Sequence, residues 1–387
     1  MSLLKRIMTV LLSILFLSSA VPMVSAEEHQ KAPDGTPVVS AHSAVLIDAY
    51  SGKVLFAKQE SERLPMASTT KIMTALLALE TAAVKDPVVT VTDEMVRVEG
   101  SSMGLMPGNK IKLSDLASGM MMVSGNDAAN TTAIAVAGNA PEFAKLMNAR
   151  AKEIGMKNTN FVTPSGLDAE GHYSTAYDMA LLGAEALSNN QFAGIVSQKQ
   201  ISVKFINPDQ TIRYGNHNRL LSLYPDSIGI KTGFTKKAGR CLVSAAERNG
   251  VKLVAVTLNA PNDWDDHEKL YDYGFSLLSP FTPDTSLFDL KVPVVGGMVD
   301  SMSVVPGAVE QISLTKEEAE QVKLTVELPR FVYAPVRAGE MVGTARYRLG
   351  NETVLEIPLL AQQAADCPQL PKTKLQKIWD GIKALFQ

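Results

Sequence analysis

The chain has 387 residues and a formal net charge of −3, with 46% hydrophobic and 20% charged residues. This composition is that of a globular protein and excludes an intrinsically disordered chain. It also argues against a nucleic-acid-binding surface, because the chain is mildly acidic and no stretch interleaves basic with aromatic residues. The length predicts two domains.

Residues 1–26 have the pattern of a secretory signal peptide. Lys5 and Arg6 form a charged start, residues 7–20 are mainly apolar, and Val24-Ser25-Ala26 offers small residues for cleavage. The alternative is an uncleaved anchor, but spanning a bilayer takes about 20 predominantly apolar residues, and serines and a proline interrupt this stretch. We therefore expect cleavage after Ala26 and export of the remainder.

Residues 27–283 are predicted to form one domain that begins with strands and continues with helices. Two short strands are expected between residues 43 and 58, around a turn at 50–53. Apolar periodicity and helix-forming residues then predict helices in four places. They are expected at 72–84, from 114 on past 126, after Pro141, and at 175–187.

Strands return towards the end of this domain. The apolar segments 241–246 and 251–258 flank Asn249-Gly250, which is a strong hairpin signal. The N-terminal hairpin is expected to join them in one antiparallel sheet, and a helix is expected from Asp266 to about Leu278. Strands at both ends with helices between them predict an α+β fold.

A change of composition at residues 279–283 marks the predicted boundary to a second domain, residues 284–370. Val322, Leu324, Val326 and Leu328 alternate with polar residues, as in a half-buried strand. Residues 349–352 have the sequence of a hairpin turn. Short strands punctuated by Gly and Pro predict a small all-β domain.

The tail, residues 371–387, is predicted to be an amphipathic helix. Its apolar residues, which include Trp379 and Phe386, recur at helical spacing, and four lysines lie off that stripe against the single acid Asp380. Such a helix suits the surface of a bilayer, where it would lie flat. The alternative is a terminal helix packed on the β domain.

Three short motifs follow one another along the chain: Ser68-Thr69-Thr70-Lys71, Ser124-Gly125-Asn126 and Lys231-Thr232-Gly233. Each alone has an ordinary explanation. The first serine could be a helix N-cap, the second motif a turn between helices, and the third a strand end with a solvated lysine. These three explanations do not predict one another, whereas a single nucleophilic centre explains all three motifs.

A serine hydroxyl becomes a useful nucleophile when a neighbouring base takes its proton. Ser68 and Lys71 are three residues apart, so a helix places both side chains on one face. Burial and a second positive charge, for which Lys231 is the candidate, lower a lysine pKa enough for it to act as that base. Ser124 could relay a proton to the leaving amine, and Asn126 could hold Lys71 and the substrate amide.

An oxyanion hole and a binding strand complete the predicted centre. The backbone N–H groups of Ser68 and Phe234 could both reach the carbonyl oxygen under attack. Gly233 lets the substrate backbone approach closely because it has no Cβ. Lys231 and Thr232 would then bind an anionic group, the terminal carboxylate of the substrate.

This ordered set resembles that of penicillin-binding proteins and serine β-lactamases. The stretches PMASTTKIMTALLALE, SGNDAAN, GHYSTAYDMA and GIKTGFTKKAGRCLVSA are most similar to low-molecular-mass penicillin-binding proteins, the serine D-alanyl-D-alanine carboxypeptidases. The resemblance implies a β-lactamase/transpeptidase-like α+β domain, an antiparallel sheet with helices, followed by a small all-β domain and an anchoring helix. It also implies that Ser68 is acylated and that Lys71, Ser124, Asn126 and residues 231–234 have the roles given above.

The same resemblance implies peptidoglycan stem peptides as substrates, β-lactam antibiotics as covalent inhibitors, and a place on the outer face of the cytoplasmic membrane. The sequence departs from the family pattern at one point. Some relatives carry an arginine near the substrate carboxylate in the loop after the last strand of the sheet, and residues 261–267 contain none. How recognition of the carboxylate is completed is therefore open at this point.

Three other functions remain open at this point. A class A β-lactamase shares the motifs but would need a deacylating glutamate, and neither Glu142 nor Glu153 lies in the expected pattern. A non-catalytic wall-binding protein should have lost a motif, and none is lost. An endopeptidase that cuts peptidoglycan cross-links cannot be separated from a carboxypeptidase by these motifs.

The sequence predicts neither a metal ion nor another cofactor. The five histidines are scattered and form no ligand spacing of a known kind. His172 is expected to be a hydrogen-bonded structural residue, since Lys71 already supplies a base. Cys241 and Cys367 lie far apart, and both are expected to be free thiols, with Cys241 buried as a small hydrophobic residue.

Overall fold

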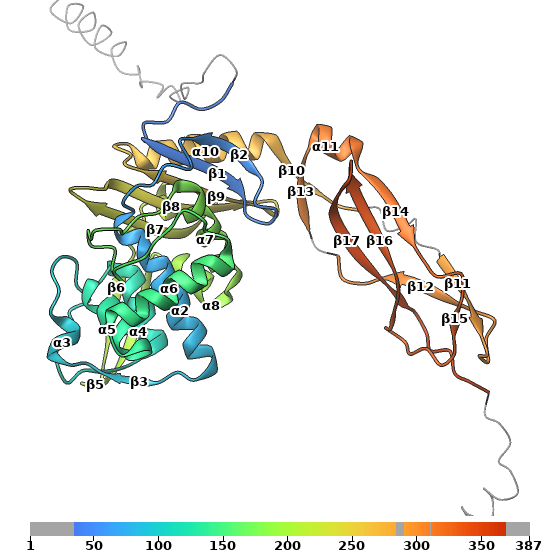
Figure 1. Ribbon diagram of the computed structural model, residues 1–387, viewed down its shortest axis with the longest axis horizontal. Helices are drawn as coiled ribbons and strands as arrows, with labels where there is room; N and C mark the ends of the chain where they lie inside the picture. Colours follow the sequence, from blue (N-terminus) through green and yellow to red (C-terminus); the bar gives the residue numbers. More distant parts are fainter. Residues whose placement is uncertain (1–34, 284–289, 310, 369–387) are drawn as a thin grey trace, which may run out of the picture. The chain divides into compact units, whose positions relative to one another are not determined.

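The computed structural model describes residues 35–283, 290–309 and 311–368 (Figure 1). The predicted signal peptide, residues 1–26, and the predicted amphipathic helix, residues 371–387, lie outside the described residues. No helix in the described part of the chain has the length and apolar character needed to cross a membrane.

A five-stranded antiparallel sheet with strand order β2-β1-β9-β8-β7 forms the centre of the first domain. Its strands are β1 (Ser43–Asp48), β2 (Val54–Lys58), β7 (Ser227–Thr235), β8 (Gly239–Arg248) and β9 (Val251–Leu258). Asn249 and Gly250 both have positive φ, 52° and 84°, as the predicted two-residue hairpin turn requires. The N-terminal hairpin joins through β1, in which Ala44 pairs with Thr257 of β9. Both predictions are confirmed.

The sheet is buried on both faces, and successive residues of β1 enter different cores. Val45 and Ile47 pack into one apolar cluster, and Ala44 and Leu46 into the other. This alternation is the two-residue period of a strand. Figure 1 shows α10 (Asp263–Leu277) on one side of the sheet and the remaining large helices on the other.

The segments predicted to be helical form α2 (Lys71–Val84), α4 (Leu113–Val123), α5 (Asn126–Ala137), α6 (Ala140–Ile154) and α7 (Ala176–Ser188). The short helix α8 (Asn190–Val196), which also contributes to the larger core, was not predicted. Ser124, with φ 59°, separates α4 from α5, so the predicted stretch from 114 past 126 is two helices. The predicted helix at 266 begins three residues earlier, at Asp263.

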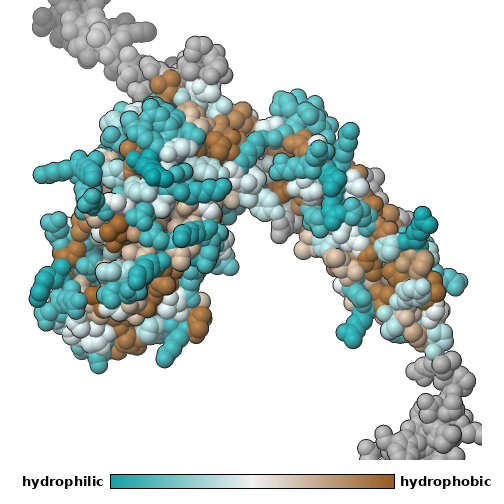
Figure 2. All heavy atoms as spheres, in the orientation of Figure 1, coloured by the Kyte–Doolittle hydropathy of each residue, from teal (hydrophilic) through white to brown (hydrophobic). Residues whose placement is uncertain are grey.

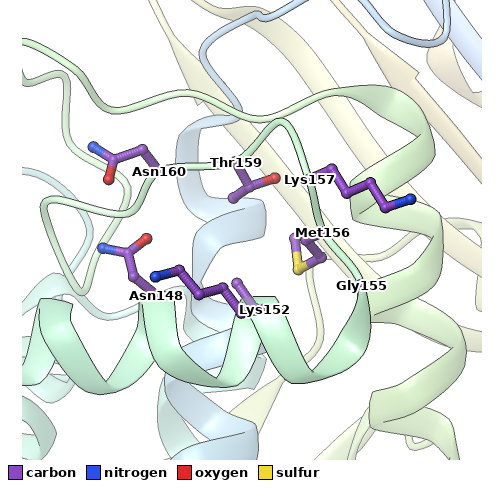
Figure 3. A pocket seen from close by; sticks show the side chains of 8 residues that line it. Asn148, Lys152, Gly155, Met156, Lys157, Thr159 and Asn160 are labelled. Atoms are coloured by element: carbon purple, nitrogen blue, oxygen red, sulfur yellow. The ribbon is translucent and has the colours of Figure 1, made fainter.

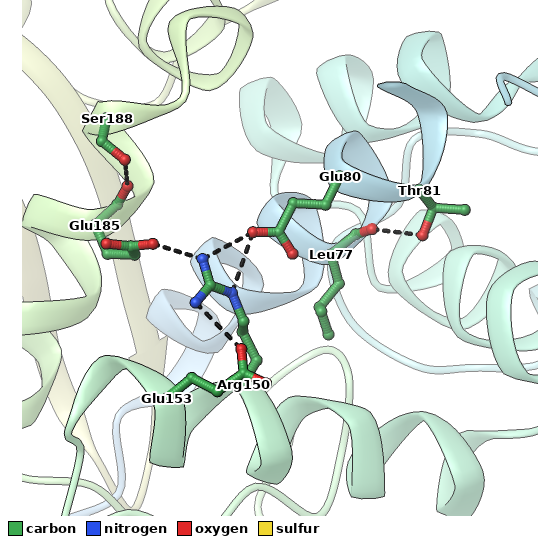
Figure 4. A network of polar contacts seen from close by, with 7 residues as sticks. All are labelled: Leu77, Glu80, Thr81, Arg150, Glu153, Glu185 and Ser188. Atoms are coloured by element: carbon green, nitrogen blue, oxygen red, sulfur yellow. Dashed lines mark hydrogen bonds and ion pairs between the residues drawn. The ribbon is translucent and has the colours of Figure 1, made fainter. Parts of the chain in front are cut away.

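Arg150 of α6 links the two helices that flank it (Figure 4). Its guanidinium donates to Glu80 of α2 and Glu185 of α7, and it also forms an ion pair with Glu153 on its own helix. Arginine suits this site because its planar fork can bind several carboxylates at once. The network ties together three helices, including α2, which carries Lys71.

A four-stranded sheet with order β3-β4-β5-β6 was not predicted from the sequence. Its strands are β3 (Val88–Thr90), β4 (Lys110–Lys112), β5 (Gln200–Asn207) and β6 (Gln210–Gly215). Two of them have only three residues, and most residues of the other two are exposed. Strands of this kind leave little apolar pattern in a sequence. Two short helices, α3 (Asp93–Val96) and α9 (Leu220–Leu223), complete this domain.

The residues after α10 form the β-rich part of the chain. A six-stranded sheet has the order β14-β16-β17-β12-β11-β15, and a two-stranded sheet pairs β10 with β13. The strands are β10 (Leu278–Phe281), β11 (Leu290–Val295), β12 (Ser301–Pro306), β13 (Ile312–Thr315), β14 (Lys323–Glu327), β15 (Val332–Tyr333), β16 (Met341–Leu349) and β17 (Glu352–Ala361). One helix, α11 (Lys316–Gln321), lies between β13 and β14. The all-β prediction is confirmed apart from this helix.

Two details of this domain bear on the sequence predictions. The hairpin turn expected at 349–352 joins β16 to β17, with Gly350 at φ 61°. The predicted alternation is found at residues 322–328, around β14. Val322, Leu324 and Leu328 are partly buried against the apolar core of this domain, so the half-buried pattern is confirmed at these positions. Val326 is the exception, because β14 is an edge strand and leaves it exposed.

Candidate active site

Ser68 lies in a turn of 3-10 helix, η1 (Ala67–Thr70), that leads directly into α2. The preceding residue, Ala67, has the left-handed conformation with φ 49°, which is uncommon for a residue with a side chain. Ser68 is partly exposed while its neighbours are buried. The sequence therefore presents one hydroxyl at the outer end of an otherwise buried segment.

Lys71, the first residue of α2, is completely buried and directs its amine at Ser68. Its Nζ donates to the Oγ of Ser68 at 2.8 Å, to Oδ1 of Asn126 at 2.7 Å and to the carbonyl oxygen of Ser165 at 2.6 Å. The predicted i, i+3 pairing of the serine with the lysine is thus present. All three hydrogen-bonding directions of the amine are fixed by neighbours.

The surroundings of Lys71 favour its neutral form. Burial lowers the pKa of its amine well below the usual range, the positive charge of Lys231 lowers it further, and Asp127 partly opposes both effects. A neutral amine has a lone pair that can accept a proton. Burial likewise lowers the pKa of Lys231 to about 7. The site therefore holds two lysines whose charged forms are both disfavoured.

Ser124 and Asn126 reach the same place from the junction of α4 and α5. Ser124 takes up the left-handed conformation at the end of α4, and Asn126 is the first residue of α5. The amide of Asn126 bridges, because Oδ1 accepts from Lys71 while Nδ2 donates to the carbonyl oxygen of Glu99 at 2.7 Å. These contacts fix the orientation of the amide.

Asp127, next to Asn126, organises the loop beside the site. Its carboxylate accepts from Ser102 Oγ and from the backbone N–H groups of Met103, Gly104 and Leu105, at 2.7 to 3.0 Å. With the backbone N–H of Ala128, at 2.8 Å, five donors bind this one buried carboxylate. The loop that follows Glu99 is thereby held against the start of α5.

Strand β7 forms the opposite wall. Lys231 is buried, and its Nζ donates to the carbonyl oxygen of Thr232 at 3.1 Å. Gly233 lies against the serine turn, where a Cβ would come within 3.0 Å of the backbone nitrogen of Ser68. Phe234 is 66% exposed. The absence of a Cβ at Gly233 therefore allows β7 to lie close against η1.

The three motifs border one cleft of about 410 Å³. Five of the eight predicted site residues line it: Ser68, Ser124, Thr232, Gly233 and Phe234. Lys71 is hydrogen-bonded to both Ser68 and Asn126. The charge of Lys231 lowers the pKa of Lys71. Residues that are up to 166 positions apart in the sequence are therefore brought together.

The rest of the cleft comes from residues that the sequence did not single out. Ser101, His217, Arg219, Arg240, Asp263 and Trp264 also line it. Asp127 and the Ser165 carbonyl group were missed as well. The position of Asp127 in the first turn of α5 is a weak signal for an acid at a helix start, but a backbone carbonyl leaves no signal in a sequence.

His172 supports the serine turn from below. Its Nδ1 accepts from the backbone N–H of Val162 at 2.9 Å, so the proton is on Nε2, which lies 3.0 Å from Thr70 Oγ1. Burial lowers the pKa of this imidazole to about 4, so it is neutral at physiological pH. These contacts are those of the predicted structural histidine.

Cys241 is buried on β8 and Cys367 is exposed, and both are free thiols, as expected. A separate hollow of about 360 Å³ lies at the C-terminal end of α6 (Figure 3). Its lining includes Lys152, Lys157 and Asn160 but no residue of the three motifs. The chemistry predicted from the sequence therefore belongs to the cleft at Ser68.

Comparison with known proteins agrees with this geometry. Residues 28–262 match the protein family described as D-alanyl-D-alanine carboxypeptidase, and residues 275–366 match the family described as penicillin-binding protein 5, C-terminal domain. The chain is 36% identical over 279 residues to D-alanyl-D-alanine carboxypeptidase DacF of Bacillus subtilis. This alignment covers 70% of the present chain and 71% of the relative. It is 34% identical to DacC of Escherichia coli over 90% of this chain and 89% of the relative.

Solved structures give the same result. Penicillin-binding protein 5 from Haemophilus influenzae has a TM-score of 0.65 and 29% identity, covering 85% of this chain and 98% of that chain. The DD-transpeptidase of Streptomyces K15 has a TM-score of 0.59 and 30% identity, covering 62% of this chain and 99% of that chain. These likenesses favour the carboxypeptidase function over the β-lactamase and wall-binding alternatives.

Proposed function

Because this chain belongs to the family of D-alanyl-D-alanine carboxypeptidases, serine-type hydrolases that bind penicillin, we propose that it removes the terminal D-alanine from peptidoglycan stem pentapeptides through an acyl-enzyme on Ser68. The observation that carries the proposal is the 2.8 Å contact between the buried Lys71 amine and the Ser68 hydroxyl at the floor of the cleft. A serine at hydrogen-bonding distance from a neutral lysine is an activated nucleophile, because the lysine can take its proton.

In the first step Lys71 takes the hydroxyl proton, and Ser68 Oγ attacks the carbonyl carbon of the D-Ala–D-Ala bond. Two N–H groups of the neutral amine remain on Asn126 and Ser165, so its lone pair points at the hydroxyl. The C=O electron pair moves onto oxygen, and the N–H groups of Ser68 and Phe234 stabilise that oxyanion. The close approach of Gly233 to the Ser68 nitrogen supports this pairing.

In the second step the oxyanion collapses and the C–N bond breaks. The leaving amine receives the proton that Lys71 took, with Ser124 as the relay between them, and D-alanine departs. Water then attacks the Ser68 ester by the reverse sequence of proton transfers, which releases the shortened peptide and restores the hydroxyl. A β-lactam acylates Ser68 in the same way, by attack on its carbonyl carbon and cleavage of the ring C–N bond, but the leaving amine stays attached to the acyl group, so the adduct persists.

The test uses a pentapeptide that ends in D-Ala-D-Ala. The wild-type protein is expected to release D-alanine, and Ser68→Ala to release none, while both retain the same circular dichroism spectrum. Intact-mass spectrometry after penicillin treatment should show an adduct on the wild type alone. Absence of both D-alanine and the adduct in the wild type would refute the proposal. A cross-linked dimer of stem peptides, assayed alongside, measures any endopeptidase activity on the same serine.

Relatives of this family act on the cell wall, which agrees with a location in the cell envelope. We further propose that residues 1–26 direct export and that residues 27–283, 284–370 and 371–387 are the catalytic domain, the β domain and a membrane anchor. The anchor would hold the enzyme on the outer face of the cytoplasmic membrane.

Exposed apolar residues beside the end of the described chain support this anchoring. Met298 is 71% and Tyr333 is 69% exposed, and the Met298 N–H donates to the carbonyl oxygen of Asp366. Figure 2 shows apolar side chains gathered over this part of the β domain. A chain lacking residues 369–387 should no longer sediment with anionic phospholipid vesicles, and retention of full binding would contradict the anchor.

A further inference from the structure

Two arginines, Arg219 and Arg240, line the cleft, and the proposed function does not yet explain the position of Arg240. Arg240 lies on β8 directly opposite Phe234 of β7 and lines the cleft together with Ser68. Its side chain is 41% exposed. The arginine that some relatives carry in the loop after the last strand is absent from residues 261–267.

Arg240 is held in place by the first two residues of α10, which lie within this segment. Its Nε and Nη2 donate to one oxygen of Asp263, at 3.0 and 2.6 Å, and the Asp263 side chain is only 3% exposed. The ring of Trp264 lies 5.6 Å from the guanidinium carbon. A guanidinium has five N–H donors, so the bonds to Asp263 leave donors for a second anion, and their direction is fixed.

Lys231 is less suited to bind the anion directly. Its amine is buried and donates to the carbonyl oxygen of Thr232, and Lys231 is not among the residues that line the cleft, whereas Thr232, Gly233 and Phe234 are. Burial lowers the pKa of Lys231 to about 7, so much of its charge is lost near neutral pH. An arginine keeps its charge throughout this range and matches the planar geometry of a carboxylate.

We propose that Arg240, positioned by Asp263 and Trp264, receives the free C-terminal carboxylate of the substrate and thereby selects peptides with a free terminus. The inference rests on the proposed carboxypeptidase function and assigns to β8 the carboxylate contact that residues 261–267 lack. Arg240 is a binding residue in this scheme, and Asp263 is a positioning residue that acts through it.

The experiment compares two substrates that differ only at the end: a D-Ala-D-Ala peptide with a free carboxylate and the same peptide as its C-terminal amide. The full exported chain is assayed as wild type, Arg240→Gln and Arg240→Lys, by the release of D-alanine or D-alaninamide. A charged hydrogen bond to a carboxylate typically contributes one to two orders of magnitude. Arg240→Gln should therefore lower kcat/KM for the free-acid peptide by roughly 10- to 100-fold and leave kcat/KM for the peptide amide almost unchanged. The preference of the enzyme for the free acid should thus be lost. Arg240→Lys should recover part of it.

Arg248→Gln is the matched control. Arg248 lies on the same strand, is 40% exposed, pairs with Asp226 and stacks on Phe275, but it does not line the cleft. It should retain the acid preference. Equal loss for acid and amide in Arg240→Gln, or an unchanged preference, would overturn the inference. If the wild type releases no D-alanine and takes no penicillin adduct, the proposed function itself has failed.

Discussion

At the scale of single residues, the site depends on how two lysines are kept from being charged. Lys71 is buried and lies within the field of Lys231, and both conditions favour its neutral form. Proton abstraction needs that form, so acylation should increase with pH through the pKa of Lys71. Lys231 thus acts on the chemistry through its charge as well as through its place on β7.

In Lys231→Met, the rise of the acylation rate constant with pH, which is the acid limb of the pH–rate profile, should shift to higher pH. Removing the positive charge raises the pKa of Lys71, so a higher pH is needed to obtain the neutral amine. The effect is expected because Lys231, with a pKa of about 7, is charged over the acid range. The measurement is the second-order rate constant for penicillin acylation between pH 4.5 and 8. The position of the limb, rather than its height, is the readout.

Lys231→Arg is the control for this experiment. It retains a positive charge at the same position, so its acid limb should stay close to that of the wild type even if acylation is slower. Coincident limbs for the wild type and Lys231→Met would show that the charge of Lys231 does not set the pKa of Lys71.

The residues that could be predicted from the sequence are those whose chemistry needs a fixed local spacing. Ser68 and Lys71 are one helical turn apart, and residues 231–234 follow one another on a strand. Their spacing in the sequence therefore determines which of these side chains lie close together. Arg240 and Asp263 could not be predicted in this way. Nothing in the sequence near either residue indicates that β8 and the start of α10 bring the two side chains together. The supporting carbonyl group of Ser165 has no side-chain identity to recognise.

At the scale of elements, the serine turn rests on the loop that contains Ser165. A Cβ at Gly166 would lie 1.9 Å from the carbonyl oxygen of Ala67, the residue before the nucleophile. The carbonyl group of the preceding residue, Ser165, accepts a hydrogen bond from the amine of Lys71. The loop therefore supports both the turn that carries Ser68 and the amine that activates it.

Gly166→Ala should impair stability and acylation together. The new Cβ would strain a residue with φ 84° and displace Ala67, at a cost of at least about 3 kcal/mol in unfolding free energy. Gly171→Ala is the matched control, since Gly171 has φ 76° but its Cβ would meet nothing closer than 3.6 Å. It should lose only about 1 kcal/mol. Denaturant unfolding and penicillin acylation are measured for both, and wild-type acylation by Gly166→Ala would contradict the proposed support.

Elements were predictable where local turn chemistry and apolar period agreed. Asn249-Gly250 between two apolar strands gave the correct hairpin, and the apolar stretch at 72–84 gave α2. The four-stranded sheet was missed because pairing to distant partners, rather than apolar pattern, stabilises strands such as β3 and β4. The half-buried alternation around β14 was also predicted correctly, since Val322, Leu324 and Leu328 pack on the core of the β domain.

At the scale of the whole molecule, the two cores of the first domain each border a neutral buried histidine. His172 lies under the serine turn, on the side of the larger core. His267 of α10 is fully buried between Ser244 of β8 and Thr257 of β9, whose hydroxyls lie 2.6 and 2.9 Å from its two ring nitrogens. A neutral imidazole offers one donor and one acceptor, which matches both settings.

The folded protein should therefore lose stability as the pH falls below about 6.5, well before most carboxylates titrate. Burial lowers the pKa of His172 to about 4 and that of His267 to about 3. In the unfolded chain both titrate near 6.5, so between these values the unfolded state binds more protons than the folded state. The unfolding free energy then falls by about 1.4 kcal/mol per pH unit for each histidine.

Urea unfolding between pH 8 and 5 measures this slope directly. His267→Asn should be less stable than the wild type at pH 8, because buried hydroxyls lose a partner, but its stability should fall less steeply with decreasing pH. His42→Asn is the control, since His42 is exposed and pairs with Glu62 at the surface. A wild-type slope retained in His267→Asn would mean that this histidine stays neutral in both states or is charged in both. In either case the acid sensitivity of the domain would have to come from other groups.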